Sequence, residues 1–575
     1  MTDYDVVFRH GTVVDGTGAE PTVADVAVTG DTIVAVGTVT GRGAHEIDAT
    51  GSLVAPGFVD VHTHYDGQAT WESDLTPSSW HGVTTAVMGN CGVGFAPVRE
   101  RDRDALIELM EGVEDIPGTA LHEGLSWEWE SFPEYLDALD KLPHDIDFAA
   151  QVPHGPLRLY VMGPRAMDLE PATAEESAEM GRLVGQALAA GALGFTTSRT
   201  LNHRSSTGGH APTITAEAAE LFAIADAVRQ AGAGVLQVVS DFFDLDGEFE
   251  MLREMARRSG RPLTMSVTET NREPDMWKTL LDRCAEATEA GVPMRGQVGV
   301  RPVGLLLSFD SSLNPFMHSP AFREIDDLPR AEKVARLRDP LVRREIIERT
   351  VVDRSGGISG GKSVGDFTRM YALGAVPNYE PDPSRSVAVI AERTGRQPAE
   401  VAYDLMLDDD GRAFLYQPIL NYARGNLDAV RAQLAHPASI PGLSDGGAHV
   451  GMICDSSFPS TLLQWWCRDR PDGRMRIQDA VAMQCRSTAE AVGLNDRGVL
   501  APGYLADINV IDFDALALTT PEVLRDLPAG GRRIVQRAHG YRHTFKSGVE
   551  IMRDGVSTAA RPGKLLRGAR PAVTR

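Results

Sequence analysis

The sequence predicts an α/β protein built on a closed parallel (β/α)8 barrel of the TIM type. Three features of the chain predict it. Apolar, strand-like runs alternate with amphipathic helical patterns through its middle, which is typical of βα units. Eight such runs are present, the number that a closed parallel barrel needs. With 575 residues, the chain is too long for one hydrophobic core and long enough for a barrel plus a smaller domain.

The eight candidate strands are short apolar runs. They span residues 57–63, 83–89, 146–152, 192–197, 235–240, 262–268, 295–300 and 439–444. Clear amphipathic helices lie between them, for example at 174–189 and 216–230. Functional residues of such barrels lie at the carboxyl ends of the strands, so each strand exit is a place to look for a site.

The first strand ends in two histidines. Residues 55–67 read Ala-Pro-Gly-Phe-Val-Asp-Val-His-Thr-His-Tyr-Asp-Gly, which is a chain break, an apolar run, and then His62 and His64. Because residues two apart on a strand point the same way, both imidazoles can face one divalent metal ion. The alternative is that two polar residues merely end a strand in solvent, and the preceding Pro-Gly break and apolar run disfavour it.

This stretch resembles the opening of the amidohydrolase superfamily, whose first barrel strand carries Gly-Phe-(Val/Ile)-Asp-x-His-x-His. More closely, the chain is similar to the D-aminoacylase (N-acyl-D-amino-acid deacylase) branch. The resemblance covers nearly the whole chain, and its most specific stretches are 55–67, 83–97 and 443–451. It implies a metal-dependent hydrolase barrel over residues 56–489, flanked by a small β-sandwich made from both chain ends.

The two chain ends are rich in strand-forming residues. Runs of valine, isoleucine and threonine broken by Asp-Gly and Gly-Asp turns occupy about 4–47, and similar runs follow residue 498. Neither end alone has enough strands for a stable sheet. Under the resemblance, residues 1–55 and 490–575 form one composite β-sandwich; two independent β appendages are the alternative.

The second and eighth strand exits supply two further candidate ligands. Cys91 lies in a glycine-rich loop after the second strand, and the corresponding cysteine of the D-aminoacylase branch is a metal ligand. A small buried cysteine that fills a barrel corner is the alternative. Asp445 follows the last strand in Ser-Asp-Gly, where the superfamily keeps its catalytic aspartate. A carboxylate there can take a proton from the attacking water and pass it to the leaving nitrogen.

Five residues at other strand exits are candidates for substrate binding. Two of them are arginines after the fourth strand, whose guanidinium groups can hold a carboxylate bidentately; surface arginine is the alternative. The five are His154, Arg199, His203, Arg204 and His449. In the hydantoinase and dihydroorotase branches, the fourth strand supplies a carboxylated lysine that bridges two metals. This chain has no lysine there, so membership of those branches is disfavoured.

The fifth and sixth strand exits depart from the D-aminoacylase pattern. That branch places a metal-binding histidine at each, whereas residues 236–242 and 264–271 of this chain contain none. Three outcomes are open: one metal held by His62, His64 and Asp445, with or without Cys91; replacement oxygen donors from Asp241 or Glu269; or a weakened site without hydrolytic power. We expect the first outcome, with zinc as the divalent ion and one ion per chain rather than two.

Two segments interrupt the barrel pattern. Residues 109–129 are acidic and aromatic, and they are predicted either to wall the barrel mouth or to pack tryptophans on its rim. Residues 305–424 form an inserted segment late in the barrel, helical near 330–337 and 341–349. Its run 356–363 has phosphate-loop spacing, but no buried strand precedes it, so we interpret it as a turn.

The sequence therefore predicts hydrolysis of an amide C–N bond, with a small-molecule N-acyl-(D-)amino acid as substrate. A hydrolase or deaminase of a cyclic amide is an alternative, disfavoured because deaminases of this superfamily also use histidines on strands five and six. A metal-free barrel that acts as a non-catalytic binding protein is another.

Charge and cysteine content bound the partners and the compartment. A net charge of −24 argues against nucleic acid and anionic membranes as partners. No apolar run reaches the length of a membrane span. The first residues do not read as a secretory signal, and the five cysteines are widely spaced, so we expect a cytoplasmic protein, either monomeric or a homo-oligomer.

Overall fold

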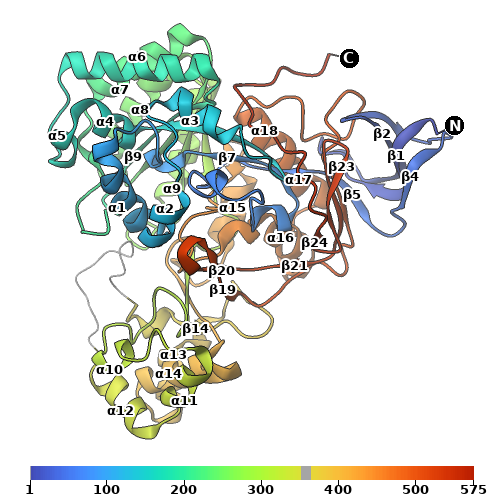
Figure 1. Ribbon diagram of the computed structural model, residues 1–575. Coiled ribbons are helices and arrows are strands. Elements are labelled where there is room, and N and C mark those ends of the chain that lie inside the picture. Colours follow the sequence, from blue (N-terminus) through green and yellow to red (C-terminus); the bar gives the residue numbers. More distant parts are fainter. Residues whose placement is uncertain (1, 351–363, 575) are drawn as a thin grey trace.

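The structure is a computed structural model that describes residues 2–350 and 364–574. Figure 1 shows three regions: a barrel at the upper left, a sheet with strands from both ends of the chain at the right, and a helical segment below. The predicted turn at 356–363 lies outside the described residues.

Eight parallel strands form the barrel and pair in chain order. They are β6 (Phe58–Asp60), β7 (Val83–Met88), β8 (Asp147–Pro153), β9 (Gly194–Arg199), β10 (Val235–Ser240), β11 (Leu263–Ser266), β12 (Met294–Val298) and β16 (Ser439–Pro441). The outer two meet through a parallel bridge between Thr63 and Gly446 and a hydrogen bond from His64 N to Gly446 O of 2.7 Å. The barrel is thus nearly closed, and all eight predicted strands are confirmed.

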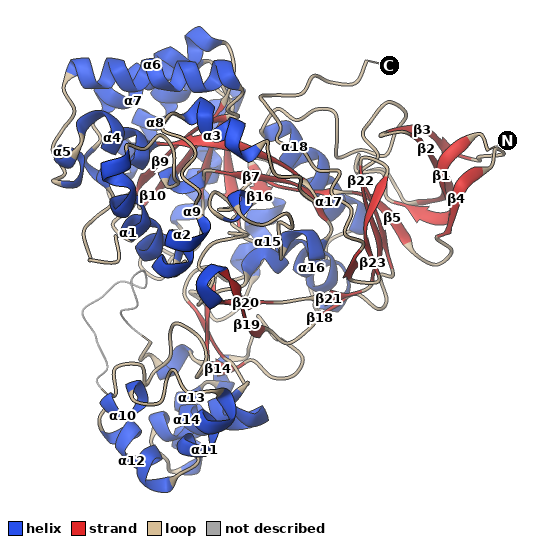
Figure 2. Cartoon of the chain, viewed as in Figure 1, coloured by secondary structure: helices blue, strands red, loops and turns tan. Residues whose placement is uncertain are grey.

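Helices cover the outside of this sheet (Figure 2). The main ones are α4 (His154–Met162), α6 (Ala174–Ala190), α7 (Ala218–Ala231), α8 (Leu245–Ser259), α9 (Met276–Glu289) and α15 (Asp428–Ala435). Helix α6 begins with a capping box between Thr173 and Glu176 and ends at Gly191 in the left-handed conformation. The helices predicted at 174–189 and 216–230 are confirmed as α6 and α7. Short helices α5 (Pro164–Met167), α16 (Phe458–Thr461), α17 (Ile477–Ala482) and α18 (Thr488–Ala491) complete the set.

The acidic and aromatic segment after β7 is helical. It forms α1 (Arg103–Glu114), α2 (Gly118–Gly124) and α3 (Phe132–Leu139). Trp129 is buried; its ring lies 5.0 Å from that of Tyr135, and its indole N–H donates to Phe95 O at 2.8 Å. The tryptophans therefore pack on the barrel rim, as one of the two predictions stated, while the end of α1 reaches the barrel mouth.

Strands from both chain ends share one sheet of nine strands. It contains β1 (Tyr4–Val13), β2 (Thr22–Thr29), β3 (Thr32–Gly37), β4 (Gly43–Asp48), β5 (Leu53–Pro56), β17 (Ile508–Ile511), β22 (Tyr541–Lys546), β23 (Val549–Arg553) and β24 (Val556–Ser557). Antiparallel pairing of β5 with β17 joins the two ends. Lys546 Nζ lies 2.8 Å from the buried Asp147 carboxylate of β8, which ties this sheet to the barrel. The boundaries at 55/56 and 489/490 stay predictions.

The inserted segment has a core of its own. It contains a small sheet of β13 (Gly304–Leu307), β14 (Tyr371–Ala372) and β15 (Leu415–Pro418), with α10 (Pro320–Arg323), α11 (Arg330–Leu337), α12 (Pro340–Glu348), α13 (Val387–Thr394) and α14 (Pro398–Gly411). The predicted helices near 330–337 and 341–349 are confirmed as α11 and α12. Four short strands lie between β17 and β22 in sequence: β18 (Ala517–Leu518), β19 (Glu522–Leu527), β20 (Gly531–Val535) and β21 (Ala538–His539).

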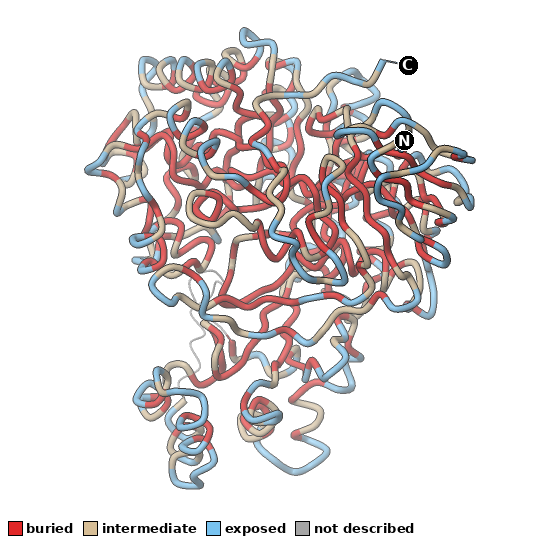
Figure 3. The backbone as a smooth tube through the Cα atoms, turned by 45° about the vertical axis from the view of Figure 1, so that its right-hand side comes forward, coloured by how far each residue is buried: buried red, intermediate tan, exposed pale blue. Residues whose placement is uncertain are grey.

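Buried backbone runs through the barrel and continues into the terminal sheet, whereas the inserted helices are exposed along their outer sides (Figure 3). Across residues 2–350 and 364–574, no helix is long and apolar enough to cross a lipid bilayer.

Candidate metal centre at the barrel mouth

His62 and His64 leave the first barrel strand with almost no exposed surface. His62 Nδ1 lies 2.6 Å from Gln297 Oε1 on β12. The amide nitrogen of Gln297 donates to Thr264 Oγ1 at 3.0 Å, so its oxygen must face the imidazole. His62 therefore carries its proton on Nδ1 and directs the Nε2 lone pair into the barrel mouth.

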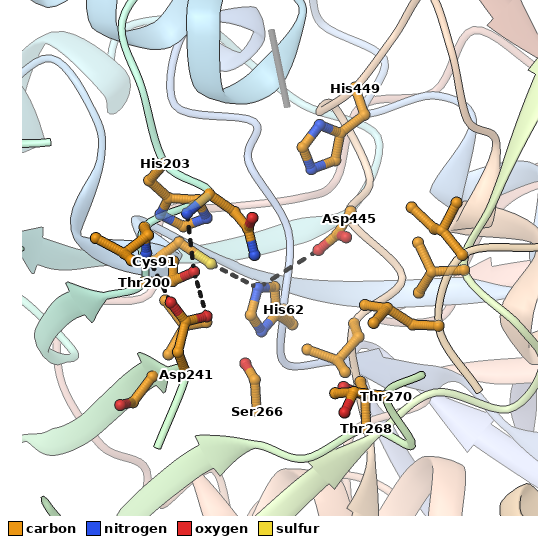
Figure 4. A pocket seen from close by; sticks show the side chains of 18 of the residues that line it. His62, Cys91, Thr200, His203, Asp241, Ser266, Thr268, Thr270, Asp445 and His449 are labelled. Carbon is orange, nitrogen blue, oxygen red and sulfur yellow. Dashed lines mark hydrogen bonds and ion pairs between the residues drawn. The ribbon is translucent and has the colours of Figure 1, made fainter. Parts of the chain in front are cut away.

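Three further predicted residues gather near that lone pair. Cys91 Sγ lies 3.2 Å from His62 Nε2, and Asp445 Oδ1 lies 3.4 Å from it. His64 Nε2 lies 3.8 Å from the same aspartate oxygen. The donor atoms of His62, His64 and Cys91 all lie within 4.8 Å of one another. Figure 4 shows His62 between Cys91 and Asp445, with the three side chains contributed by three different strand exits.

The backbone at this position is strained. Cys91, Asp445 and His449 have φ angles of 56°, 49° and 48°, in the left-handed region that residues other than glycine seldom adopt. Such strain persists only where surrounding contacts enforce it, and it concentrates at functional sites. Here the Cys91 N–H donates to Gln237 Oε1 at 3.0 Å, and the Asp445 N–H donates to His62 O at 3.1 Å.

Burial drives all four side chains towards their neutral forms. It raises the pKa of Asp445 to about 7 and the pKa of the Cys91 thiol well above its usual range. It lowers the pKa of His62, and it lowers that of His64 still further, where the nearby His62 adds to the effect. In the described part of the chain, no lysine or arginine forms an ion pair with either acidic group.

The donor set fits a divalent metal ion. Two imidazole nitrogens, one thiolate sulfur and one carboxylate oxygen are all ligand types that zinc accepts. A cation at this position would supply the positive charge that the buried thiol and carboxyl lack, and so favour their ionised forms.

The four side chains lie on the wall of a cavity of about 570 Å³. Most of its remaining wall is apolar. It comes from β10, α9, the two ends of the inserted segment and the loop after β16, including Val239, Phe242, Met276, Leu280, Leu305, Ile419, Leu420, Leu443, Met452 and Ile453. Ser266 and Thr268 line the side opposite His203 and His449 in Figure 4. A mostly apolar cavity with a few converging polar groups is typical of a small-molecule site.

Three of the five predicted substrate-binding residues line this cavity: His203, Arg204 and His449. His203 Nδ1 is 2.8 Å from Ser198 Oγ. Burial lowers the pKa of His203 to about 3 and that of His449 to about 4, so both rings are neutral near pH 7.

The structure does not bring His154 or Arg199 into the cavity. His154 is fully buried and contacts Thr197 Oγ1 at 2.8 Å and Glu220 Oε1 at 2.7 Å. Arg199 forms an ion pair with Glu248 of α8. Since successive strand residues point to opposite faces, the last residue of β9 faces the outer helices rather than the barrel mouth.

The two acidic residues considered as replacement donors are engaged elsewhere. Asp241 lines the cavity but accepts hydrogen bonds from Thr200 Oγ1 at 2.7 Å and Leu201 N at 2.8 Å, so it holds the loop that carries His203. Glu269 is fully buried and pairs with Arg424 at 3.1 Å. Among the described residues, the group of donors within 4.8 Å of one another consists of His62, His64 and Cys91, and it contains none of Asp241, Glu269 and Asp445.

Two residues of the site have no counterpart in the sequence predictions. Glu114, at the end of α1, is 1% exposed and lies 3.3 Å from His64 Nδ1. Arg272 follows β11, lines the cavity and lies 4.3 Å from the ring of Phe243. The only sequence signal for Glu114 was the acidic stretch assigned to the mouth, and Arg272 had none.

Comparisons with known proteins identify the family and the fold. The sequence matches the model of the amidohydrolase family over residues 45–552. It is 39% identical to a D-aminoacylase of Alcaligenes xylosoxydans xylosoxydans over 196 residues, a match that spans 34% of this chain and 37% of that protein. An uncharacterised protein of Mycobacterium tuberculosis is 29% identical and aligns with 88% of this chain and 84% of its own length.

Solved structures share the fold. A D-aminoacylase described as having a binuclear metal centre superposes with a TM-score of 0.66 and 24% identity, covering 99% of this chain and all of that one. An N-acyl-D-glutamate deacylase from Bordetella bronchiseptica, in complex with zinc and a phosphonate inhibitor, superposes with a TM-score of 0.64 and 24% identity, covering 98% of this chain and 99% of that one. Because the family match spans most of its length, this chain belongs to the amidohydrolase family.

Proposed function

We propose that this protein is a metal-dependent hydrolase that removes the acyl group from an N-acyl amino acid. The observation that carries the proposal is the convergence of His62, His64, Cys91 and Asp445 at the mouth of a barrel. The match to a D-aminoacylase and weaker matches to N-acyl-D-aspartate and N-acyl-D-glutamate deacylases support the substrate class.

In this proposal His62, His64, Cys91 and Asp445 hold one zinc ion. A zinc ion held there would activate water and polarise the acyl oxygen. Asp445 accepts the proton of the attacking water and returns it to the leaving nitrogen. His203 and His449, both neutral and inside the cavity, orient the substrate, and the apolar wall receives its carbon chain.

Two cations at the cavity support an anionic substrate. Arg204 donates to Leu201 O and Gly208 O, both at 3.2 Å, and Arg272 stacks on Phe243. Among the described residues, neither guanidinium forms an ion pair with a carboxylate. Each is therefore available to bind the carboxylate of an N-acyl amino acid, despite the negative charge of the whole protein.

Arg272→Ala is expected to raise KM about tenfold and leave kcat nearly unchanged. A charge-assisted hydrogen bond contributes about 1.5–3 kcal/mol, and the low end of that range applies because Arg272 is exposed. Steady-state kinetics with an N-acyl amino acid and with its uncharged C-terminal amide tests this. With the amide as substrate, wild type and Arg272→Ala should have the same KM. Arg257→Ala, on the outer face of α8, is the matched control. An equal KM for wild type and variant would remove Arg272 from substrate binding.

The purified protein is expected to carry about one zinc per chain, measured by elemental analysis. Removal of the ion with a chelator should abolish hydrolysis of N-formyl-, N-acetyl- and longer N-acyl amino acids of both hands, and added zinc should restore it. A second candidate function, a non-catalytic binding protein, follows from the missing histidines after β10 and β11. A protein that retains no metal and hydrolyses none of these compounds would favour that candidate.

We further propose a cytoplasmic location. The five cysteines are free in the structure, which suits a reducing compartment. We propose a small molecule as the partner of the cavity, with no nucleic acid or membrane partner; a homo-oligomer stays a prediction.

A further inference from the structure

Glu114 is a buried carboxylate with no basic lysine or arginine partner. Its Oε1 lies 3.3 Å from His64 Nδ1 and its Oε2 lies 3.4 Å from His449 Nε2. Within residues 2–350 and 364–574, neither Glu114 Oε2 nor His64 Nδ1 has a hydrogen-bond partner, and no lysine or arginine pairs with this side chain, so the glutamate and the imidazole face each other with unused hydrogen-bonding capacity. Burial of such a group destabilises a fold, so stability does not explain its presence.

The end of helix α1 holds Glu114 in this place. The next residue, Asp115, has a φ of 50°, which stops the helix and leaves Glu114 on the cavity side. Asp115 Oδ2 accepts a hydrogen bond from Gly451 N at 3.1 Å. The loop after β16 is thereby docked onto α1, which sets His449 beside Glu114.

His62 has a polar neighbour at Nδ1, as His64 does. Its Nδ1 faces the Gln297 amide oxygen, and its Nε2 faces Cys91 and Asp445. His64 repeats this arrangement with Glu114 at Nδ1 and Asp445 at Nε2. The two imidazoles thus differ in the group behind them: a neutral amide behind one, a carboxylate behind the other.

We infer that Glu114 is a positioning residue that orients His64 towards the metal ion and holds His449 over the cavity. This inference rests on the proposed function. With the ion bound, the carboxylate, 3.3 Å from His64 Nδ1, would accept the proton of that nitrogen, so that the Nε2 lone pair is presented to the ion and the anionic acceptor makes Nε2 a stronger donor. Its second oxygen lies 3.4 Å from His449 Nε2, close enough to hold that ring over the cavity.

Metal binding by purified variants tests the inference. The dissociation constant for zinc is measured by competition with a chromogenic chelator in wild type, Glu114→Gln, Glu114→Ala and Glu108→Gln. Loss of such a partner lowers metal affinity about 10- to 100-fold. We expect about tenfold weaker binding for Glu114→Gln, which can still accept one hydrogen bond, and about a hundredfold for Glu114→Ala. Glu108, exposed on the same helix, is the matched control and should bind as wild type does.

Thermal melting of the metal-free proteins separates positioning from folding. Glu114→Gln without metal should melt at the wild-type temperature or above it, because the substitution replaces a buried acidic group with a neutral amide of the same size. Equal zinc affinity in wild type and both Glu114 variants would overturn the inference and leave the proposed function standing. A wild type that binds no zinc at all would overturn both.

Discussion

Asp445→Asn is expected to lower kcat by two to four orders of magnitude while the protein stays folded. Proton transfer by a positioned group contributes about 10²–10⁴ to rate, and asparagine can neither accept the proton of the attacking water nor pass it on. The side chains have nearly the same shape, and the Asp445 backbone N–H still donates to His62 O. Steady-state kinetics of the zinc-loaded variant, with circular dichroism as the check of folding, measures the effect.

Asp246→Asn is the control for this prediction, because that side chain is 82% exposed on α8 and should leave kcat unchanged. Zinc content must be determined for both variants, since Asp445 is also a proposed ligand. A zinc-loaded Asp445→Asn enzyme with wild-type kcat would exclude the aspartate as the base.

Zinc affinity is expected to fall about a thousandfold between pH 8 and pH 6. In the metal-free protein the pKa of the Cys91 thiol lies well above its usual range and that of Asp445 is about 7. Ligands must lose their protons to bind a metal ion, and each displaced proton weakens affinity about tenfold per pH unit. One proton is displaced between pH 8 and 7, from Cys91. Below pH 7 two protons are displaced, from Cys91 and Asp445. Zinc affinity therefore falls about 10-fold from pH 8 to 7 and about 100-fold from pH 7 to 6.

Substitutions assign these protons to residues. Cys91→Ser removes the thiol, so the slope of zinc affinity against pH should decrease by one proton over the whole range from pH 8 to 6. In Asp445→Asn the slope should decrease only below pH 7. The histidines add nothing in this range because burial lowers the pKa of both. Zinc affinity that does not change between pH 8 and 6 would mean that the ion binds without Cys91 and Asp445.

The metal-free protein should show the opposite trend in stability. A carboxyl group whose folded pKa is raised stabilises the fold at low pH, below its unfolded pKa, and that contribution is lost as pH rises through the folded value. For Asp445 this window runs from about pH 4 to about 7. Bound zinc reverses the effect, because it favours the ionised carboxylate.

The barrel could be predicted from the sequence because its strands are local apolar runs. Strand β10 was predicted at its observed bounds, and the other seven lie within a few residues of prediction. The pair His62 and His64 could also be predicted, since the two-residue repeat of a strand fixes that they share a side. Cys91 and Asp445 were placed by family resemblance.

What the sequence alone determined was therefore the barrel, the strand exits and the four residues that converge there. Only the tertiary structure decided which polar residues reach the cavity. Arg199 and His154 also sit at strand exits, yet they pair with glutamates of the outer helices, while Glu114 enters the mouth from a helix that no motif marks. The physical reason is that strand alternation acts over two residues, whereas the partner of a buried charge is chosen by packing between segments far apart in the chain.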